Sequence, residues 1–413
     1  MGILKKLFSI RQRDPMHREI RILGLRFKYR CVPRDKELFH HLPIERNKIV
    51  FCTQQGAYHC SPKYISEEIR RRRLPYDLVW VVNLNVLRYI DSFPEGVRLV
   101  MRGTRDALRE LATARIWVEN ERKCQEVLAG LRKREGQVYI DTWHGSLGIK
   151  NTGQQRGDIR PKDLMLARED AQQVDFLISN ATYTTNFYKD VFWGHGQVLE
   201  YGCPRNDIFF SMPTSEQREA LCRKLGVTSQ KKLLLYAPTW RRGGNDSCFN
   251  LDYAQVRSAL SERFGGEWII LVRLHPFMLD KEELFFPKGI AEGEIVNATN
   301  LPDMQELLVV ADACITDYSS CVYDYLHTGR PAFIYAPDMA EYSAGRGLCY
   351  PLEETPFDLA TNNETLVQCI RDFNFDTYAQ RVQTFLRGKG CIEDGHATQR
   401  VVDLIENIIN QNI

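Results

Sequence analysis

The sequence predicts an α/β protein made of two Rossmann-like domains, whose parallel sheets face one another across a cleft. Short runs of strand-forming residues alternate with helical segments along most of the chain, which is the order that gives parallel sheets covered by helices on both faces. The alternation restarts near residue 211, and 413 residues are too many for one ordinary core. We therefore predict an N-terminal domain over residues 31–210 and a C-terminal domain over residues 211–413.

The N-terminal domain is predicted from six strand-like runs with helical segments between them. Its first helix, SPKYISEEIRRR, is expected to take Ser61 as its N-cap and to carry Pro62 in its first turn. The six runs are KIVFCT at 48–53, YDLVWVVN at 76–83, RIWVEN at 115–120, GQVYIDTW at 136–143, QQVDFLISN at 172–180 and GQVLEYG at 196–202.

The C-terminal domain repeats this alternation. A helix at 215–226 leads into five strand-like runs, and an amphipathic helix at 397–411 is expected to close the domain. The five runs are KKLLLYAPTW at 231–240, EWIILVRLHP at 267–276, EIVNAT at 294–299, ADACITDYSS at 311–320 and PAFIYAP at 331–337.

The composition is typical of a soluble globular protein, with 44% hydrophobic and 26% charged residues. The longest apolar runs, such as WIILV, are far shorter than a membrane span, and the N-terminus lacks the features of a signal peptide. None of the 12 cysteines stands in a CxxC pair, so we expect reduced core thiols. The formal net charge of +2 indicates no particular partner, and we expect no nucleic-acid ligand. These features predict a protein that is cytoplasmic or lies on the cytoplasmic face of the cell membrane.

Residues 1–30 form a basic arm. They hold nine Lys or Arg against Asp14 and Glu19, which gives a local charge of +7. On a helix, Ile3, Leu7 and Ile10 would share one face and the basic residues would lie around the other, as in helices that bind anionic membranes. A helix that packs on the core, or a disordered arm, is the alternative. We predict an amphipathic arm that attaches the protein peripherally to the membrane surface.

Polar side chains follow four of the predicted strands. They are His144 in the first half, and Thr239, Arg241, His275, Ser319 and Ser320 in the second. Each has a structural explanation on its own, because such a histidine can be a packed polar residue and a Ser-Ser pair can be a helix cap. Ligands of open parallel sheets, however, bind beyond the carboxyl ends of the strands. The shared position predicts one site between the two domains.

The site is suited to a phosphate-bearing ligand. The helix that starts at Ser319 and Ser320 offers backbone N–H groups and hydroxyls to an anion. Asp324, one turn deeper, is expected to hold a ribose hydroxyl, and the arginines to bind phosphoryl oxygens. Those arginines are Arg205, Arg241 and Arg273. No DxD pair, GxGxxG, Walker loop or metal-ligand cluster occurs in the sequence, so we expect no metal and no tightly bound cofactor.

Five motifs carry a resemblance to a known family. They are DTWHGSLGIK, YGCPRNDIFF, LLLYAPTWRR, VRLHP and ITDYSSCVYDYLHTGRPAFIYAPDMAEYSAGRG. In this order, between residue 48 and the closing DGHATQRVVDLI, they resemble the motifs of the CDP-glycerol glycerophosphotransferase family, the teichoic acid primases and polymerases. One departure is visible, since the family often reads Gly-Thr-Pro-Leu-Lys after the histidine and this chain reads GSLGIKN.

The resemblance implies a GT-B architecture with an acceptor-side N-terminal domain and a CDP-donor-binding C-terminal domain. It implies transfer of glycerol phosphate, or a related polyol phosphate, from CDP-glycerol or CDP-ribitol to a hydroxyl of a lipid-linked or polysaccharide acceptor, with release of CMP. In this family His144 would be the base, and His275 would stabilise the phosphates together with Arg273. The positions matching the family's donor contacts are Gly148, Ile149, Lys150, Asn151, Thr152, Arg205, Pro238, Thr239, Ser319, Ser320 and Asp324.

Two other functions fit the same sequence. A GT-B glycosyltransferase that uses a sugar nucleotide would share the fold and the phosphate-binding groups, and a screen of CDP-linked and sugar-nucleotide donors would separate the two enzymes. A non-catalytic nucleotide-binding scaffold is the second alternative, and it predicts that replacing His144 leaves the cellular phenotype intact.

Overall fold

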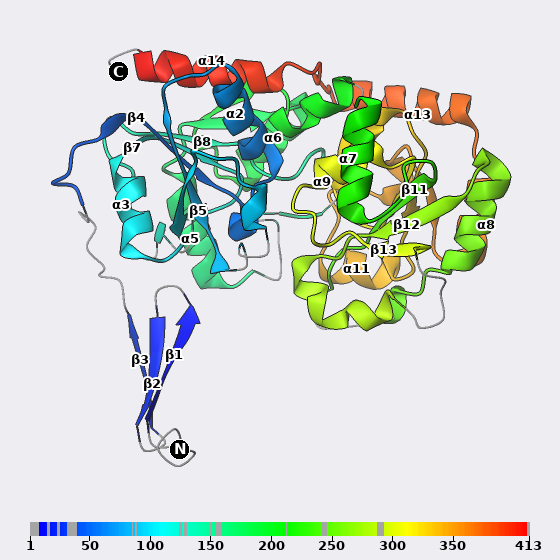
Figure 1. The fold of residues 1–413 in the computed structure, drawn as a ribbon, viewed down its shortest axis with the longest axis horizontal. Helices are drawn as coiled ribbons and strands as arrows, with labels where there is room; N and C mark the ends of the chain where they lie inside the picture. The colour runs from blue at the N-terminus through cyan, green and yellow to red at the C-terminus, as the bar shows by residue number, and fades with distance from the viewer. Residues whose placement is uncertain are drawn as a thin grey trace.

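The structure is a computed structural model of the whole chain. It describes residues 8–410 except for 15–16, 23–24, 31–38, 85, 87–88, 124–125, 128–129, 149, 153–154, 156–158, 212, 242–245 and 287–292. Two parallel sheets form the body of the molecule, as predicted, and a small third sheet precedes them (Figure 1).

The sheet of the N-terminal domain has seven parallel strands in the order β10-β9-β8-β7-β4-β5-β6. Six of them match the predicted runs, whereas β6, a strand of only four residues of which one is exposed and three are partly buried, was not predicted. The strands are β4 (Glu45–Cys52), β5 (Asp77–Val82), β6 (Arg98–Met101), β7 (Ala114–Glu119), β8 (Val138–Asp141), β9 (Phe176–Ser179) and β10 (Gln197–Glu200).

The sheet of the C-terminal domain has six parallel strands in the order β13-β12-β11-β14-β15-β16. Its central strands are buried along their whole length, which explains their continuous apolar sequences. The strands are β11 (Lys232–Ala237), β12 (Trp268–Val272), β13 (Ile295–Asn297), β14 (Ala313–Thr316), β15 (Ala332–Tyr335) and β16 (Asp358–Ala360).

Helices connect the strands and cover both sheets. The first begins two residues earlier than predicted, with His59 rather than Ser61 as its N-cap, and Thr214 closes a capping box on α7. In the N-terminal domain the α-helices are α2 (Cys60–Arg71), α3 (Arg105–Thr113), α5 (Pro161–Ala171) and α6 (Thr182–Val191). After them come α7 (Ser215–Leu225), α8 (Tyr253–Phe264), α9 (Met304–Val310), α10 (Cys321–Tyr325), α11 (Met339–Gly345), α12 (Asn363–Arg371), α13 (Phe375–Gly388) and α14 (Ala397–Asn410).

The last helix, α14, lies on the N-terminal domain, although the sequence analysis assigned it to the C-terminal domain (Figure 1). Val401 and Ile405 belong to the same apolar cluster as Ile49 and Phe51 of β4. An all-parallel sheet needs cover on both faces, and the apolar face of α14 supplies part of that cover. The boundary predicted at 211–413 therefore includes a helix that belongs to the other domain.

Residues 8–14, 17–22 and 25–30 form strands, whereas the spacing of Ile3, Leu7 and Ile10 predicted an amphipathic helix at the start of the arm. The strands β1 (Phe8–Asp14), β2 (His17–Ile22) and β3 (Leu25–Arg30) make an antiparallel sheet that stands apart from the two domains in Figure 1. Apolar and polar residues alternate along 19–22 and 25–30, which is the strand period of two and not the helical period. Residues 1–7 of the predicted helix lie outside the described part of the chain.

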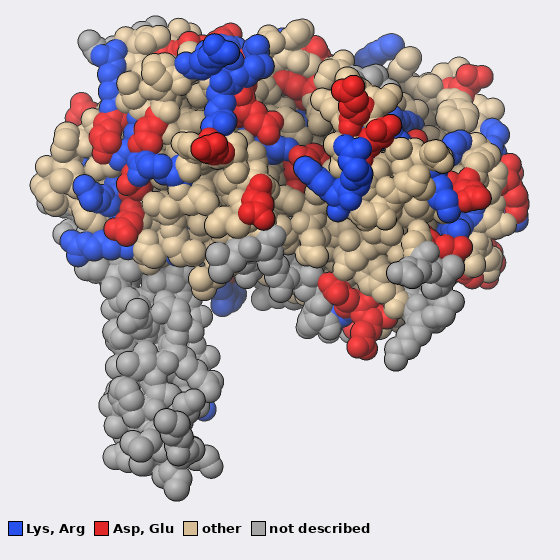
Figure 2. Space-filling view, in the orientation of Figure 1, with Lys and Arg blue, Asp and Glu red and all other residues tan. Residues whose placement is uncertain are grey.

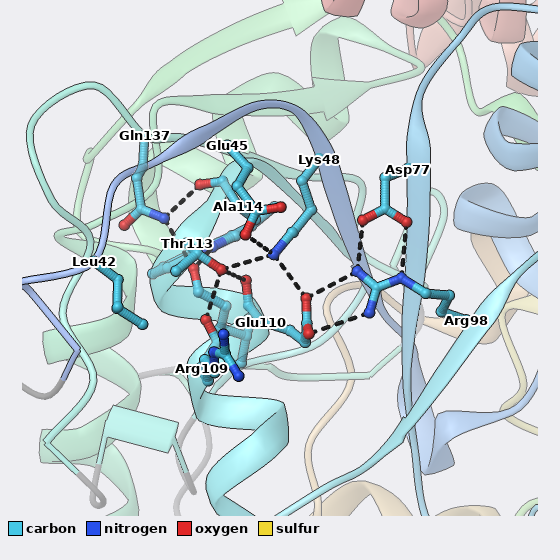
Figure 3. A network of polar contacts seen from close by, with 12 residues as sticks. Leu42, Glu45, Lys48, Asp77, Arg98, Arg109, Glu110, Thr113, Ala114 and Gln137 are labelled. Carbon is cyan, nitrogen blue, oxygen red and sulfur yellow. Dashed lines mark hydrogen bonds and ion pairs between the residues drawn. The ribbon is translucent and has the colours of Figure 1, made fainter.

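A polar network fixes the amino ends of the N-terminal strands (Figure 3). The buried ammonium of Lys48 lies 2.8 Å from Glu110 and donates to the hydroxyl of Thr113 at 2.8 Å. Arg98 joins Asp77, at 2.5 Å, to Glu110, at 3.1 Å. Because a buried lysine is tolerated only when it is paired, the network ties β4, β5 and β6 to α3 at the end of the sheet opposite the strand ends predicted to carry the site.

Surface charges of both signs are interspersed over the face of the two domains seen in Figure 2. Many are paired between elements: Arg72, which follows α2, lies 2.5 Å from Asp403 and 2.7 Å from Glu406 of α14. Among the helices of the described residues, none is long and apolar enough to cross a membrane.

Candidate active site

A cavity of about 1090 Å³ lies between the domains, beyond the carboxyl ends of both sheets. The two domains approach each other closely at this cavity. A Cβ added to Gly145 of the N-terminal domain would lie 3.9 Å from the hydroxyl of Ser320 of the C-terminal domain. The predicted site residues on its wall are His144, Gly148, Lys150, Thr152, Thr239, Arg241, His275 and Ser320.

His144 is held in one tautomer by the backbone. The strand β8 ends at Asp141, whose carboxylate accepts the backbone N–H of Trp143 at 2.7 Å and fixes the turn that follows. Nδ1 of His144 lies 2.6 Å from the carbonyl oxygen of Asn120. A carbonyl can only accept, so Nδ1 carries the proton and Nε2 keeps a lone pair. Burial lowers the pKa of His144 to about 4, so the ring is neutral at pH 7.

His275 is held in the opposite tautomer. It ends the segment after β12 and caps the short helix η7 (Pro276–Leu284), where its Nδ1 accepts the backbone N–H of Phe277 at 3.2 Å. The proton of the neutral ring is therefore on Nε2. Burial, together with the nearby charges of Lys150 and Arg273, lowers the pKa of His275 to about 4. The ring stacks on Trp240 with centroids 6.2 Å apart.

The loop that follows His144 belongs by sequence to the N-terminal domain but is bonded to the C-terminal one. The carbonyl of Leu147 accepts the hydroxyl of Tyr350 at 2.6 Å, and Lys150 forms a β-bridge with Leu348. Asn151 extends this attachment through a backbone bond to Gly347 and is not among the residues on the cavity wall. The attachment brings the Lys150 side chain onto the wall, where burial lowers its pKa to about 8. Ile149 lies outside the described residues.

The two serines differ in their placement. Ser320 lies on the cavity wall and precedes α10 without using its hydroxyl as a helix cap. Ser319 is half-buried, and its hydroxyl accepts the backbone N–H of Cys321 at 3.5 Å. Thr239 lies on the wall with a backbone N–H bonded to Asp317 at 2.9 Å and a buried hydroxyl that has no partner. Pro238, just before it, is buried and off the wall.

Arg241, one of the arginines predicted to bind phosphoryl oxygens, lies on the wall and is paired with two carboxylates. Its guanidinium lies 2.9 Å from Asp317 and 2.6 Å from Asp338, and its centre lies 4.8 Å from the ring of Tyr318 and 4.9 Å from that of Tyr342. A guanidinium this deeply buried requires carboxylate partners to offset its lost hydration. The pair of aspartates therefore neutralises the charge that the sequence analysis assigned to phosphate.

Arg205 and Asp324 are paired with each other, which differs from the separate donor contacts that the sequence analysis expected. Nε of Arg205 lies 2.9 Å from one oxygen of Asp324 and Nη2 lies 3.2 Å from the other, with both side chains at most 5% exposed. Neither residue is on the cavity wall. Arg273 is also off the wall, where it donates to the carbonyl of Pro302 at 2.9 Å and leaves Nη1 without a partner.

With this geometry in hand, comparison with known proteins identifies the family. Residues 36–407 match the family described as CDP-Glycerol:Poly(glycerophosphate) glycerophosphotransferase. The chain belongs to this family.

The names of the relatives of this chain refer to teichoic acid. The chain is 28% identical over 382 residues to a teichoic acid poly(glycerol phosphate) polymerase of Bacillus subtilis, covering 88% of this chain and 49% of the relative. It is 27% identical over 290 residues to a teichoic acid ribitol-phosphate primase of Bacillus spizizenii, covering 67% of this chain and 71% of the relative. The chain thus spans about half the length of the polymerase.

A solved structure shares the fold. A histidine variant of the wall teichoic acid polymerase TagF, soaked with CDPG, superposes with a TM-score of 0.74 at 27% identity, over 91% of this chain and 92% of that one. The two-sheet arrangement described above is therefore that of this family.

Sequence reasoning missed several residues of the candidate site. Trp143, Phe187 and Trp193 lie on the cavity wall, as does Arg122. Trp143 is adjacent to His144 at a strand end, so the sequence could have predicted it as a site residue. The sequence around the other three residues does not distinguish them from core residues. Among the described residues, no group of three or more His, Cys, Asp or Glu is placed to hold a metal ion.

A buried hydrogen-bond network behind the site was also not predicted from the sequence. Asn180 donates to Ser146, two residues after His144, at 2.8 Å and to Glu393 at 3.0 Å. Glu393 also accepts from Asn206 at 2.8 Å and from the backbone of Cys203 at 3.0 Å. Burial raises the pKa of Glu393 to about 7. The network joins the loop that carries the histidine to the segments that link the domains, with partners up to 213 residues apart.

Proposed function

We propose that the protein transfers glycerol phosphate, or a related polyol phosphate, from a CDP-linked donor to a hydroxyl group of a lipid-linked or polysaccharide acceptor, and releases CMP. The product is a teichoic-acid-like or capsular polymer. Membership of the family and the CDPG named with the TagF structure support the donor. One observation carries the proposal: two neutral histidines of opposite tautomer, His144 and His275, line one cavity from opposite domains.

The two tautomers give the histidines different chemical roles. Nε2 of His144 takes the proton of the acceptor hydroxyl. The acceptor oxygen forms a bond to the β-phosphorus of the donor, while the bond from that phosphorus to the bridging oxygen breaks and CMP leaves with that oxygen. Nε2–H of His275 donates a hydrogen bond to a phosphate oxygen, and Lys150 supplies positive charge on the same wall.

Donor binding strengthens the base. A pKa of about 4 would make His144 a weak base in the empty cavity. The negative phosphates favour the protonated forms of nearby groups, so they raise the pKa values of His144, His275 and Lys150. The proton acceptor is thus activated in the complex in which it is needed.

The charge of the N-terminal arm bears on where in the cell the protein acts. Residues 1–30 hold nine Lys or Arg against two acidic residues, and a basic segment of this kind is attracted to an anionic membrane surface. We propose that the protein works at the cytoplasmic face of the membrane, where a lipid-linked acceptor would be presented.

The decisive experiment measures CMP release and product mass with CDP-glycerol, CDP-ribitol and sugar nucleotides, each with a hydroxyl acceptor. The expected result is transfer from a CDP-polyol only, lost in His144→Ala and retained in the control His195→Ala, whose side chain is not on the cavity wall. Transfer from a sugar nucleotide would favour a glycosyltransferase, and full activity of His144→Ala would remove the base from the mechanism.

A further inference from the structure

The wall that the N-terminal domain contributes to the cavity is largely aromatic. Six of its residues are Phe, Tyr or Trp, and they come from the loop after β8 and from α6 and the turn that follows it. They are Trp143, Tyr183, Phe187, Tyr188, Phe192 and Trp193.

The rings form a chain of contacts from the proposed base, in which Tyr188 links Phe192, at 5.4 Å, to Phe187, at 6.5 Å, centroid to centroid. The ring of Trp143 lies 4.4 Å from that of His144 and 4.7 Å from that of Phe192, centroid to centroid. On α6, Tyr183 and Phe187 are four residues apart and therefore on one face, with their rings 6.2 Å apart and inclined by only 15°. Phe187 is half-buried, so part of its ring is left for a ligand.

The charges on this wall do not suit a polyanion. Among its described residues the ones with full charges are Arg122, Lys150 and Asp163. Arg122 lies 3.2 Å from Asp141 and 3.4 Å from Asp170, two buried carboxylates that neutralise it, and its guanidinium lies 4.1 Å from the centre of the Phe192 ring. Lys150 is attached to the C-terminal domain, as described above, and Asp163 is negative.

From these observations, and resting on the function proposed above, we infer that the acceptor group bound here is a neutral sugar ring. The apolar C–H face of a pyranose packs on the electron-rich face of an aromatic ring, whereas a poly(glycerol phosphate) end would bring one negative charge per unit. Pockets of this type fix their ligand with a few polar groups, which Thr184 and Asp163 provide on this wall. The sugar hydroxyl next to Trp143 would be the one that His144 deprotonates.

The test compares two soluble acceptors, methyl β-glycosides of hexoses and N-acetylhexosamines, and tri(glycerol phosphate). Phe187→Leu keeps an apolar side chain of similar size and removes the aromatic face. We expect the KM for the methyl glycosides to rise about two- to tenfold, the worth of one aromatic contact, with kcat and the Kd for CDP-glycerol unchanged. Phe375→Leu, a half-exposed phenylalanine of the C-terminal domain that is not on the cavity wall, is the matched control.

Faster transfer to tri(glycerol phosphate) than to every glycoside, or an unchanged KM in Phe187→Leu, would overturn the inference. A second readout separates it from the proposed function. Saturable quenching of tryptophan fluorescence by methyl glycosides, reduced in Trp193→Phe, supports the sugar subsite even if no transfer from CDP-glycerol occurs. Absence of such quenching counts against the subsite whatever the transfer assay gives.

Discussion

Replacing Asp324 by asparagine tests whether this residue holds Arg205 or the donor. Its two oxygens accept from Arg205 at 2.9 and 3.2 Å, from Asn206 at 3.2 Å and from Gln305 at 3.0 Å. The Arg205 side chain is 2% exposed, so Asp324→Asn leaves a buried cation without its counter-charge. Removing one partner of a buried pair costs about 3–5 kcal/mol, and we expect a loss of that size in the free energy of unfolding.

The measurement is urea unfolding followed by circular dichroism, at matched m-values, for Asp324→Asn, Arg205→Gln and the double variant. If the pair acts as a unit, the double variant is less destabilised than the sum of the two single variants. Calorimetric titration with CDP-glycerol is run on the same proteins below their unfolding transitions. The affinity of the folded protein is expected to change little, because neither residue lies on the cavity wall.

The opposite pattern would refute this reasoning. An Asp324→Asn protein with unfolding free energy within about 0.5 kcal/mol of the parent, but with CDP-glycerol binding lost, would make Asp324 a donor contact after all. The ion pair would then open when the donor binds.

Five further predictions concern the site and the arm. His144→Ala is expected to lose about 100-fold or more in turnover with donor affinity retained, as measured by CMP release and calorimetry. Because burial lowers the pKa of His144 to about 4 in the donor-free protein, kcat/KM for CDP-glycerol, which reports that form, should persist as the pH falls below 7 and decline only as the pH drops through that value; an acid limb near pH 6.5 in this parameter would contradict it. Ser319→Ala combined with Ser320→Ala should weaken CDP-glycerol binding moderately, since the backbone donors remain, and an unchanged Kd would reduce the serines to a helix cap. Activity is expected to survive EDTA, and a stoichiometric metal whose removal abolishes turnover would oppose this. The full chain should float with anionic liposomes at low salt, and a chain lacking residues 1–30 should not. Equal flotation of these two proteins would exclude the arm as the membrane anchor.

The strand ends were the part of the site that the sequence could predict. Continuous apolar runs such as WIILV form strands buried on both faces, and a polar residue directly after such a run must lie at the carboxyl edge of the sheet. This logic correctly brought His144 and His275 to one cavity, although they are in different domains.

Pairing between charges could not be predicted in the same way. Arg241 finds its carboxylates 76 and 97 residues away, and Arg205 finds Asp324 119 residues away. A local pattern reveals that a guanidinium is present but not whether folding has already neutralised it. The prediction for the basic arm was wrong for a different reason. The spacing of Ile3, Leu7 and Ile10 is helical, but the alternation of apolar and polar residues that follows it is that of strands.

The position of α14 makes the C-terminal domain an insertion within the N-terminal one. The chain leaves the N-terminal domain near Cys203 and returns near Glu393, and these two crossings are hydrogen-bonded to each other at 3.0 Å. Two crossings at nearly one point have the geometry of a hinge, and a rotation of the domains about it would change the width of the cleft. The contact of Lys63 with Asp303, at 2.8 Å across the interface, is one that such an opening has to break. Substrate entry and product exit would then be governed by the interface rather than by a separate lid.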